Sequence, residues 1–167
     1  MNPTLKYRTG NLNDLKELKA LGLVTFGQYQ SQLLPEHWKT LLDNLQNEER
    51  LLELIKVSKT FVCLHDNKII GRAFLVPKGN PTPIFEKEWA QIRMVGVDSN
   101  YAGQGIAKEL TRLCIEEAKQ LNEKIIALHT SEMMVAARHI YESIGFKQVK
   151  EIDDLFGKRY WLYHLEI

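Results

Sequence analysis

The sequence predicts an α/β (α+β) fold, because segments with the pattern of strands alternate along the chain with segments that have the pattern of amphipathic helices. Gaps of loop length that contain glycine or proline separate these segments. Of the 167 residues, 44% are hydrophobic and 26% charged, the balance of an ordinary globular protein with a substantial core. Since no repeat, low-complexity tract or flexible linker interrupts the pattern, we expect a single domain over residues 1–167.

The N-terminal third is expected to form one strand and two helices. Residues 5–8 have the character of a short strand. A first helix follows and is expected to loosen around Gly22 and Gly27. Pro35 suits the first turn of a second helix, which residues 51–57 can extend. Both helices carry apolar side chains at near-helical spacing: Leu12, Leu15, Leu18 and Leu21 in the first, and Trp38, Leu41, Leu42 and Leu45 in the second.

Three strands are expected in the middle of the chain. Residues 60–64 and 69–76 are rich in β-branched and apolar residues. They flank Asp66-Asn67, a polar pair suited to a tight turn, which predicts a hairpin. After an irregular loop rich in proline, the apolar run over residues 89–97 predicts the third strand.

The last third is expected to alternate helix and strand before a final hairpin. Apolar residues at helical spacing predict helices over residues 106–121 and 133–144, and Gly145 is a suitable C-terminal cap for the second. Asp153, Asp154 and Gly157 are expected in the final turn. The remaining strands are predicted over residues 125–128, 146–152 and 159–166. In total we expect about six to seven strands and about four helices.

Charge and composition limit the classes of partner. Lysine and arginine total 22 against 21 for aspartate and glutamate, so we expect neither nucleic acid nor a membrane surface as a partner. No signal-peptide-like run occurs in residues 1–10, which favours a cytoplasmic protein. Cys63 and Cys114 lack the spacing of a disulfide framework and are expected to be buried and reduced. The histidines are scattered without metal-ligand spacing, so no metal site is expected.

The strongest local signal is the junction between the strand that ends near Val97 and the helix that starts at Ile106. Gly103 and Gly105 remove side chains from the turn between them, and Ala107 keeps the first helical turn thin. Such a junction presents unpaired backbone N–H groups and the positive end of a helix dipole, which together suit a phosphate. We therefore expect the backbone of this turn to bind a pyrophosphate.

Other nucleotide motifs fit this segment less well. A Rossmann fingerprint would place a third small residue at Lys108, and a Walker A loop would require Gly-Lys-Ser/Thr after four intervening residues. Neither pattern occurs. A nucleotide-binding module that uses the Gly103–Ala107 turn therefore stays a secondary interpretation, as it leaves the later segment Ala137–Phe146 unexplained.

Two segments resemble the GNAT superfamily of N-acetyltransferases. Val95-x-Val97-x3-Tyr101-Ala102-Gly103-Gln104-Gly105-Ile106-Ala107-x2-Leu110 is similar to the motif that binds the acetyl-CoA pyrophosphate, Gln/Arg-x-x-Gly-x-Gly/Ala. Ala137-x-x-Ile140-Tyr141-Glu142-x-x-Gly145-Phe146 is similar to the second cofactor segment, Ala-x-x-Leu-Tyr-x-x-x-Gly-Phe. The resemblance is close from Trp89 to Phe146, and the order of elements agrees with it over nearly the whole chain.

The resemblance implies a GNAT-like fold and a site for acetyl-CoA. Its sheet is central, mixed and mostly antiparallel, and the strands that end near Val97 and Leu128 splay apart, with the pantetheine arm of the cofactor between them. Two positions depart from the family pattern: Ala102 stands where Gln or Arg is usual, and Met134 where many members have Asn. The cofactor-binding residues are expected to be Val95, Gly96, Val97, Ala102, Gly103, Gln104, Gly105, Ile106, Ala107, Lys108, Met134 and Tyr141.

Attack of an amine on a thioester requires a neutral amine, a donor for the developing oxyanion and a proton for the departing sulfur. The resemblance places the Tyr141 hydroxyl beside that sulfur as the general acid, while packing of this tyrosine against Phe146 is the structural alternative. A backbone N–H freed by a β-bulge within Met94–Val97 is expected to be the oxyanion donor. Glu88 is the candidate base, and Glu86, Glu132 and His129 are neighbouring candidates.

The resemblance implies a small-molecule or peptide amine as acceptor. Small amines, antibiotics, amino acids, polyamines and protein N-termini stay open, as does a longer acyl-CoA donor. Arg93 can meet an acidic group of the acceptor or pair inside the protein, and we favour an internal or edge pairing. Aromatic candidates for the acceptor groove are Phe26, Tyr29, Trp38, Phe85 and Trp89.

A different class of function is an acetyl-CoA-binding sensor or interaction domain without turnover. The absence of an evident base and the methionine at position 134 favour this alternative, whereas Tyr141 favours an enzyme. Pairing through an edge strand would give a homodimer, an arrangement that the sequence leaves open.

Overall fold

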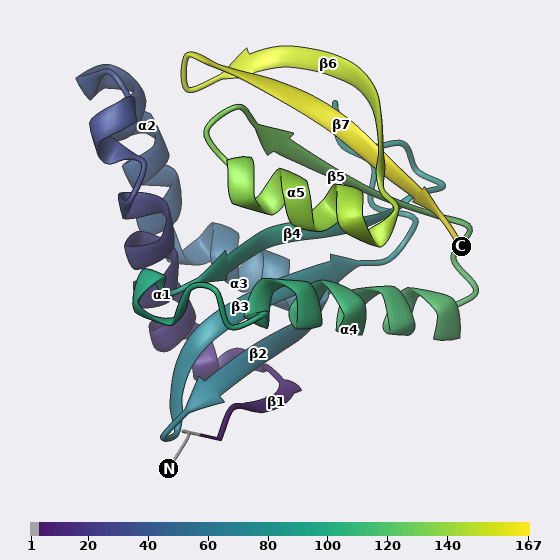
Figure 1. The fold of residues 1–167 in the computed structure, drawn as a ribbon, viewed down its shortest axis with the longest axis horizontal. Helices are drawn as coiled ribbons and strands as arrows, with labels where there is room; N and C mark the ends of the chain where they lie inside the picture. The colour runs from purple at the N-terminus through teal and green to yellow at the C-terminus, as the bar shows by residue number, and fades with distance from the viewer. Residues whose placement is uncertain (1–3) are drawn as a thin grey trace.

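The computed structural model describes residues 4–167, and the first three residues of the predicted domain lie outside that part. Helices and strands alternate in the predicted order (Figure 1). The strands are β1 (Lys6–Thr9), β2 (Lys59–His65), β3 (Lys68–Val76), β4 (Ala90–Val97), β5 (Ile125–Ser131), β6 (Lys147–Leu155) and β7 (Lys158–Glu166). The α-helices are α1 (Leu15–Gly27), α2 (Pro35–Gln46), α3 (Glu48–Val57), α4 (Ile106–Gln120) and α5 (Val135–Ile144).

The strands form one sheet in the order β1-β2-β3-β4-β5-β7-β6. Every neighbouring pair is antiparallel except β4 and β5, which run parallel. This confirms the mixed, mostly antiparallel sheet. The hairpin between β2 and β3 turns at Asp66 and Asn67, both of which have positive φ, at 48° and 63°. Aspartate and asparagine tolerate this conformation, so the polar pair makes the expected tight turn.

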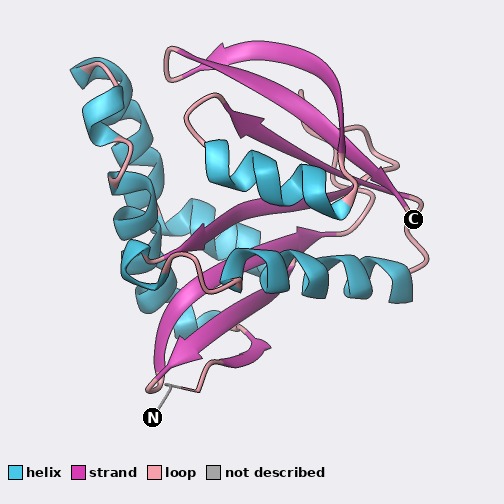
Figure 2. Ribbon diagram, in the orientation of Figure 1, coloured by secondary structure: helices cyan, strands magenta, loops and turns pink. Residues whose placement is uncertain are grey.

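The helices cover both faces of the sheet (Figures 1 and 2). α4 packs on β2, β3 and β4, and α5 packs on β5 and against α4. Side chains of these two helices bury the main core, which includes Ile106, Leu110, Cys114 and Tyr141. On the other face, α1 packs on β3 and β4 and α3 on β3, around a second core that contains Leu18, Ile55 and Phe74. Cys63 and Cys114 are both buried and free, as expected.

The helix α1 runs through Gly22 instead of loosening there, which corrects the expectation from the sequence. A glycine is present at this position because the buried guanidinium of Arg72 lies against the helix. Its Nη1 donates to the Leu18 carbonyl of α1 at 2.7 Å. A Cβ atom on Gly22 would lie 2.9 Å from Arg72 Nη2. The glycine therefore provides room for a buried arginine and does not break the helix.

Two further boundaries differ from the prediction. The second predicted helix divides into α2 and α3 at Asn47, whose extended backbone ends α2 and whose side chain accepts a hydrogen bond from the Arg50 N–H at 3.1 Å. This asparagine thus begins a fifth helix as its N-cap. In the final hairpin, Asp153 and Asp154 extend β6, and Phe156 and Gly157 make the turn with φ of 54° and 72°.

Candidate active site

The parallel strands β4 and β5 pair only at their beginnings. Ala90 pairs with Ile126 and Gln91 with Ala127, and no further pair joins the two strands within the described chain. β4 nevertheless continues to Val97 and β5 to Ser131, and the strands diverge toward those ends (Figure 1). The expected splaying of these strands is confirmed. It opens the middle of the sheet beyond Gln91 and Ala127, where the later residues of the two strands do not pair with one another.

A β-bulge interrupts β4 at this opening. Arg72 of β3 pairs with Gly96, and Phe74 pairs with Arg93, so two steps along β3 correspond to three along β4. The extra residue lies at Met94–Val95, and Met94 has a φ of +52°, unusual for a residue with a side chain. The expected β-bulge within Met94–Val97 is therefore present, and a bulge leaves its extra residue out of the ladder.

The bulge also changes which side chains share a face of the sheet. Ile92 and Val95 pack into the core on the side of α4, although two residues separate them. Between them, Met94 contacts the core on the side of α1, and Arg93 approaches Phe85, which belongs to a cluster with Ala127 and Leu162. Without a bulge, strict alternation would place consecutive residues on opposite faces. The bulge therefore directs both Arg93 and Met94 away from α4.

The turn before α4 has the geometry expected of an anion site. Gly103 and Gly105 have φ of +78° and +75°, and a Cβ atom built on either would meet no protein atom within 4 Å. Among the described residues, the backbone N–H groups from Gly103 to Lys108 donate to no protein acceptor. Glycine at these positions thus leaves open space beside unpaired donors at a helix N-terminus, where a pyrophosphate fits.

A groove of about 240 Å³ continues from this turn between α4 and α5. Lys108 and Arg112 contribute positive charge to it, but Arg112 is paired with Glu109 at 2.7 Å. The Lys108 ammonium is the cation of this groove that has no ion-pair partner among the described residues. Its residues are Gly105, Lys108, Glu109, Arg112, Ile115 and Ile144.

The other predicted cofactor residues fall into two groups. Ala102 and Gln104 are exposed beside the glycines of the turn, whereas the Ile106 side chain is buried in the core. Ile106 thus anchors α4, and only its backbone faces the turn. Val95 and Val97 pack on the core on the side of α4, and Gly96 lies against Thr25 of α1.

Tyr141 lies on α5 with 7% of its surface exposed and its ring at an edge-to-face angle to Phe146, 5.9 Å away. Burial raises the pKa of the Tyr141 phenol well above its usual range, so the hydroxyl stays protonated at neutral pH. Met134 precedes α5, and its sulfur accepts a weak hydrogen bond from Thr130 Oγ1 at 3.7 Å. The structure therefore shows the packing of Tyr141 against Phe146, and the role of its hydroxyl as a proton donor stays a prediction.

Arg93 has neutral internal partners and no internal ion pair. Its Nη1 donates to Gln91 Oε1 at 3.3 Å, and its guanidinium lies 5.7 Å from the centre of the Phe85 ring. Within residues 4–167, no carboxylate forms a salt bridge with it. Burial lowers the pKa of Arg93, and the positive charge of Arg50 on α3 lowers it further. The guanidinium is therefore a poorly compensated cation beside the opening.

His129 lies on β5 across the opening from Arg93. Its ring stacks on Phe85 at 5.7 Å and meets Tyr160 edge to face at 5.5 Å. Burial, and to a lesser degree the charge of Arg93, lower the pKa of His129 to about 4. The Nδ1 atom is buried without a hydrogen-bond partner in the described chain. His129 is thus a neutral imidazole at physiological pH, and its burial was not evident from the sequence.

The predicted base and aromatic residues are distributed over different parts of the fold. Glu88 is exposed in the turn before β4, whereas the bulge residue Met94 lies in the second half of that strand. Phe85 lies under Arg93 and His129, and Trp89 packs against His164. The other three aromatic candidates, Phe26, Tyr29 and Trp38, form one cluster with Met94, Met133 and Phe156 on the side of α1 and α2.

Two features are absent from the described residues. No group of three or more histidine, cysteine, aspartate or glutamate side chains within residues 4–167 is arranged to hold a metal ion. None of the helices in that range combines the length and apolar character needed to cross a membrane.

The chain has relatives of known name, which sequence comparison identifies. A family model described as the acetyltransferase (GNAT) family matches residues 24–146. N-acetylaspartate synthetase of Xenopus tropicalis is 36% identical over 93 residues, which are 56% of this chain and 32% of that protein. N-acetyltransferase 8B of Homo sapiens is 31% identical over 88 residues, which are 53% of this chain and 38% of that protein. The chain thus matches about a third of the length of these curated relatives.

Solved structures share the fold over nearly the whole chain. The PaiA N-acetyltransferase of Thermoplasma acidophilum, solved in complex with coenzyme A, has a TM-score of 0.79 at 16% identity and covers 98% of this chain and 99% of its own. The ribosomal-protein-alanine N-acetyltransferase of Brucella melitensis has a TM-score of 0.73 at 21% identity. The match covers 97% of this chain and 99% of that protein. At these identities the similarity establishes the arrangement of helices and strands.

Proposed function

Because this chain belongs to the GNAT family of acetyltransferases and is an acyltransferase, we propose that it transfers an acetyl group from acetyl-CoA to a primary amine, by direct attack within a ternary complex. The observation that carries this proposal is the opening between β4 and β5, with a β-bulge on one strand and an unpaired glycine turn at the start of α4. A thioester held in that opening is accessible to an amine from the face away from α4.

The donor side of the site is proposed to bind acetyl-CoA mainly through backbone groups. The N–H groups of Gly103 to Lys108 would bind the pyrophosphate, and the charge of Lys108 would support them. The backbone of Val95 to Val97, beside the opening, would bind the pantetheine arm. Met134 would make apolar contact with the cofactor, because its sulfur already accepts a hydrogen bond from Thr130. The missing side chain at Ala102 leaves these backbone donors unchanged.

The chemical step is proposed to use three groups of the protein: a backbone N–H, the Tyr141 hydroxyl and a base. The amine nitrogen attacks the carbonyl carbon, the C–N bond forms and the C–S bond breaks. A backbone N–H of the Met94–Val95 bulge would donate to the oxygen that becomes negative. Tyr141, kept neutral by burial, would give its proton to the departing sulfur.

The remaining proton, lost by the amine, requires a base. His129 and Glu88 are the candidates, and they differ in location. His129 is neutral and lies at the opening, whereas Glu88 is exposed on the loop before β4 and would act through water. We propose that His129 is the better-placed base, and Glu88 is the alternative.

The acceptor is proposed to be a small-molecule or peptide amine. Several sequence relatives are N-acetylaspartate synthetases and so are named for an N-acetylated amino acid. This supports an amine of amino-acid size for the present chain. The volume of the pocket beside Arg93, about 390 Å³, is also in the lower part of the range for small-molecule sites.

Calorimetric titration with acetyl-CoA tests the proposal, together with the variants Gly105→Ala and Gly105→Glu. Both variants place a side chain on a residue with positive φ, but only glutamate brings a negative charge next to the pyrophosphate. We expect binding in the wild type, weaker binding in the alanine variant and loss of binding in the glutamate variant. Absence of binding by the folded wild type, or equal affinity in all three proteins, would contradict the proposed donor site.

A further inference from the structure

Arg93 is a partly buried cation at the acceptor side of the opening, and the described protein gives it no counter-ion. A guanidinium has five N–H donors, and a single hydrogen bond, to the neutral Gln91 Oε1 at 3.3 Å, accounts for its side-chain contacts to oxygen. Removing a charge even partly from water without an ionic partner costs free energy, and the lowered pKa of Arg93 reflects this cost. We therefore look for the missing ionic partner of Arg93 in a ligand.

The partner of Arg93 inside the protein is itself held in place. Gln91 Nε2 donates to the Asn80 carbonyl at 2.7 Å, and Asn80 Nδ2 donates to the Pro77 carbonyl at 2.9 Å. These bonds fix the loop before β4 and direct the Gln91 carbonyl oxygen toward Arg93. Gln91 thus holds one edge of the Arg93 guanidinium, and the remaining N–H groups are available to a ligand.

The surroundings of Arg93 are electropositive. Arg50 on α3 acts on Arg93 as a like charge, and His129 across the opening is neutral. Arg50 donates to the neutral Asn44 Oδ1 at 2.6 Å, and it forms no salt bridge among the described residues. Two arginines without acidic partners thus act on the same region, where an anionic ligand would be stabilised and a cationic one repelled.

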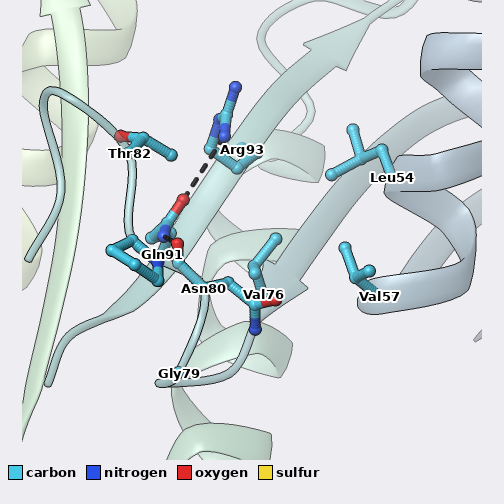
Figure 3. A pocket seen from close by; sticks show the side chains of 9 residues that line it. Leu54, Val57, Val76, Gly79, Asn80, Thr82, Gln91 and Arg93 are labelled. Atoms are coloured by element: carbon cyan, nitrogen blue, oxygen red, sulfur yellow. Dashed lines mark hydrogen bonds between the residues drawn. The ribbon is translucent and has the colours of Figure 1, made fainter. Parts of the chain in front are cut away.

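A pocket of about 390 Å³ adjoins this cation. Figure 3 shows Gln91, Arg93 and Thr82 on one side of it, and the apolar side chains of Leu54 and Val57 from α3 on the other. An apolar wall opposite a few fixed polar groups is the usual arrangement of a small-molecule site. Arg93 also immediately precedes Met94, so an anion bound to it lies beside the bulge, where the amine would attack.

We propose that Arg93 binds a carboxylate of the acceptor, so that the amines acetylated by this enzyme are of the amino-acid class. This inference rests on the proposed acetyl transfer and specifies its acceptor. A planar carboxylate matches the guanidinium in a two-bond contact. The pocket then holds the rest of the acceptor between Leu54, Val57 and Gln91.

The experiment compares amino acids with their amides as acceptors. Release of the CoA thiol from acetyl-CoA is followed for a panel of L-amino acids and the matching L-amino-acid amides, and kcat/KM is determined for each. The measured quantity is the ratio of kcat/KM for acid over amide. The α-amine of an amino-acid amide is less basic than that of the amino acid itself. The ratio is therefore compared between wild type and variants, because this difference in basicity is the same for every protein. Aspartate with asparagine, and glutamate with glutamine, distinguish a side-chain carboxylate from the α-carboxylate.

Three variants complete the design. We expect Arg93→Gln to lower the acid-to-amide ratio about 10- to 100-fold, the range for losing a hydrogen bond to a charged group. Arg93→Lys keeps the charge without the planar fork and should lose only part of the ratio. Arg159→Gln is the matched control, because it removes an exposed arginine that is already paired with Glu151 at 2.8 Å. Its ratio should equal that of the wild type.

The outcomes separate this inference from the proposed function. An unchanged ratio in Arg93→Gln, acetylation of amides alone, or binding of acetyl-CoA without acetylation of any amino acid would overturn the carboxylate assignment and leave the donor site standing. Preference for an aminoalkyl phosphate over every amino acid would overturn it in favour of a phosphate ligand. Failure of the folded wild type to bind acetyl-CoA would instead overturn the proposed function itself.

Discussion

Arg93 and His129 each lie two residues beyond Gln91 and Ala127, the last pair that joins the parallel strands β4 and β5. Both side chains contact the ring of Phe85, the guanidinium at 5.7 Å from its centre and the imidazole stacked at 5.7 Å. The two groups therefore stand on either side of the opening, on the face away from α4. Because both are desolvated, the charge of one affects the protonation of the other.

Removing the charge of Arg93 should raise the pKa of His129. Burial is the larger cause of the low value, so in Arg93→Met the pKa should rise from about 4 but stay below the ordinary 6.5. A titration of the His129 ring protons by NMR measures this change. An unshifted His129 would show that the two groups do not interact.

The same variant should be at least as stable as the wild type. Arg93 is partly buried and has no carboxylate partner in the described chain, and replacing such a cation by an apolar side chain of similar length removes a desolvation cost. We expect the free energy of unfolding of Arg93→Met to be unchanged or higher by about 1 kcal/mol. Urea unfolding at pH 7 tests this. A loss above about 2 kcal/mol would indicate that Arg93 supports the fold instead of a ligand.

His129 should make the protein less stable in mild acid. The folded protein keeps this imidazole neutral down to about pH 4, whereas the unfolded chain takes up a proton below about pH 6.5. The unfolded state therefore binds more protons between these values, and stability falls as pH decreases from 6.5 toward 4. The full effect is on the order of 3 kcal/mol.

Comparison with His129→Gln isolates this contribution. His164, whose pKa burial also lowers, is present in both proteins, as are all carboxylates. The difference in unfolding free energy between wild type and variant should therefore change by a few kcal/mol between pH 7 and pH 4.5, in the direction of relative destabilisation of the wild type. Parallel curves for the two proteins would contradict the low pKa.

Gly22→Ala should destabilise the protein even though alanine is the better helix former. The added Cβ would lie 2.9 Å from Arg72 Nη2, and the buried guanidinium could move only by weakening its bond to the Leu18 carbonyl. We expect a loss of about 1–3 kcal/mol. In Gly27→Ala, at the end of the same helix, the new methyl group meets no atom within 4 Å, and stability should be unchanged or slightly higher. Thermal melting of both variants tests the contrast.

Tyr141→Phe should slow the chemical step and leave donor binding intact. Loss of a general acid typically costs a factor of about 100 to 10,000 in rate. The hydroxyl forms no side-chain hydrogen bond in the described protein, so calorimetry should give an unchanged affinity for acetyl-CoA. Tyr7→Phe, on β1 and distant from the opening, is the control and should keep full turnover. Equal rates for Tyr141→Phe and the wild type would leave this tyrosine with a packing role alone.

Paired substitutions distinguish the two candidates for the base. We expect His129→Gln to lower kcat by about 100-fold or more and Glu88→Gln to have a small effect, because the histidine lies at the opening and the glutamate is exposed on the preceding loop. Turnover is measured with the best acceptor of the amino-acid panel. The reverse order of effects would identify Glu88 as the base, acting through water.

The sequence by itself determined the order of elements, the turn before α4 and the family. These features rest on local rules: apolar periodicity, the freedom of Gly103 and Gly105 to adopt positive φ, and two motifs in the correct order. The separation of β4 and β5 was predicted from the family resemblance, not from local rules. Local rules failed at Gly22, because the demand for space there comes from Arg72, 50 positions later in the chain.

Tertiary structure alone decided the environment of the acceptor side. Nothing local indicates that the β4 bulge directs both Arg93 and Met94 away from α4, or that Phe85, from a loop, lies under both Arg93 and His129. The expected ionic partner for Arg93 was wrong for the same reason, since desolvation and pairing depend on which distant segments meet. Electrostatic energies follow the distances and burial of the folded chain, and these are set only when the sheet and its helices assemble.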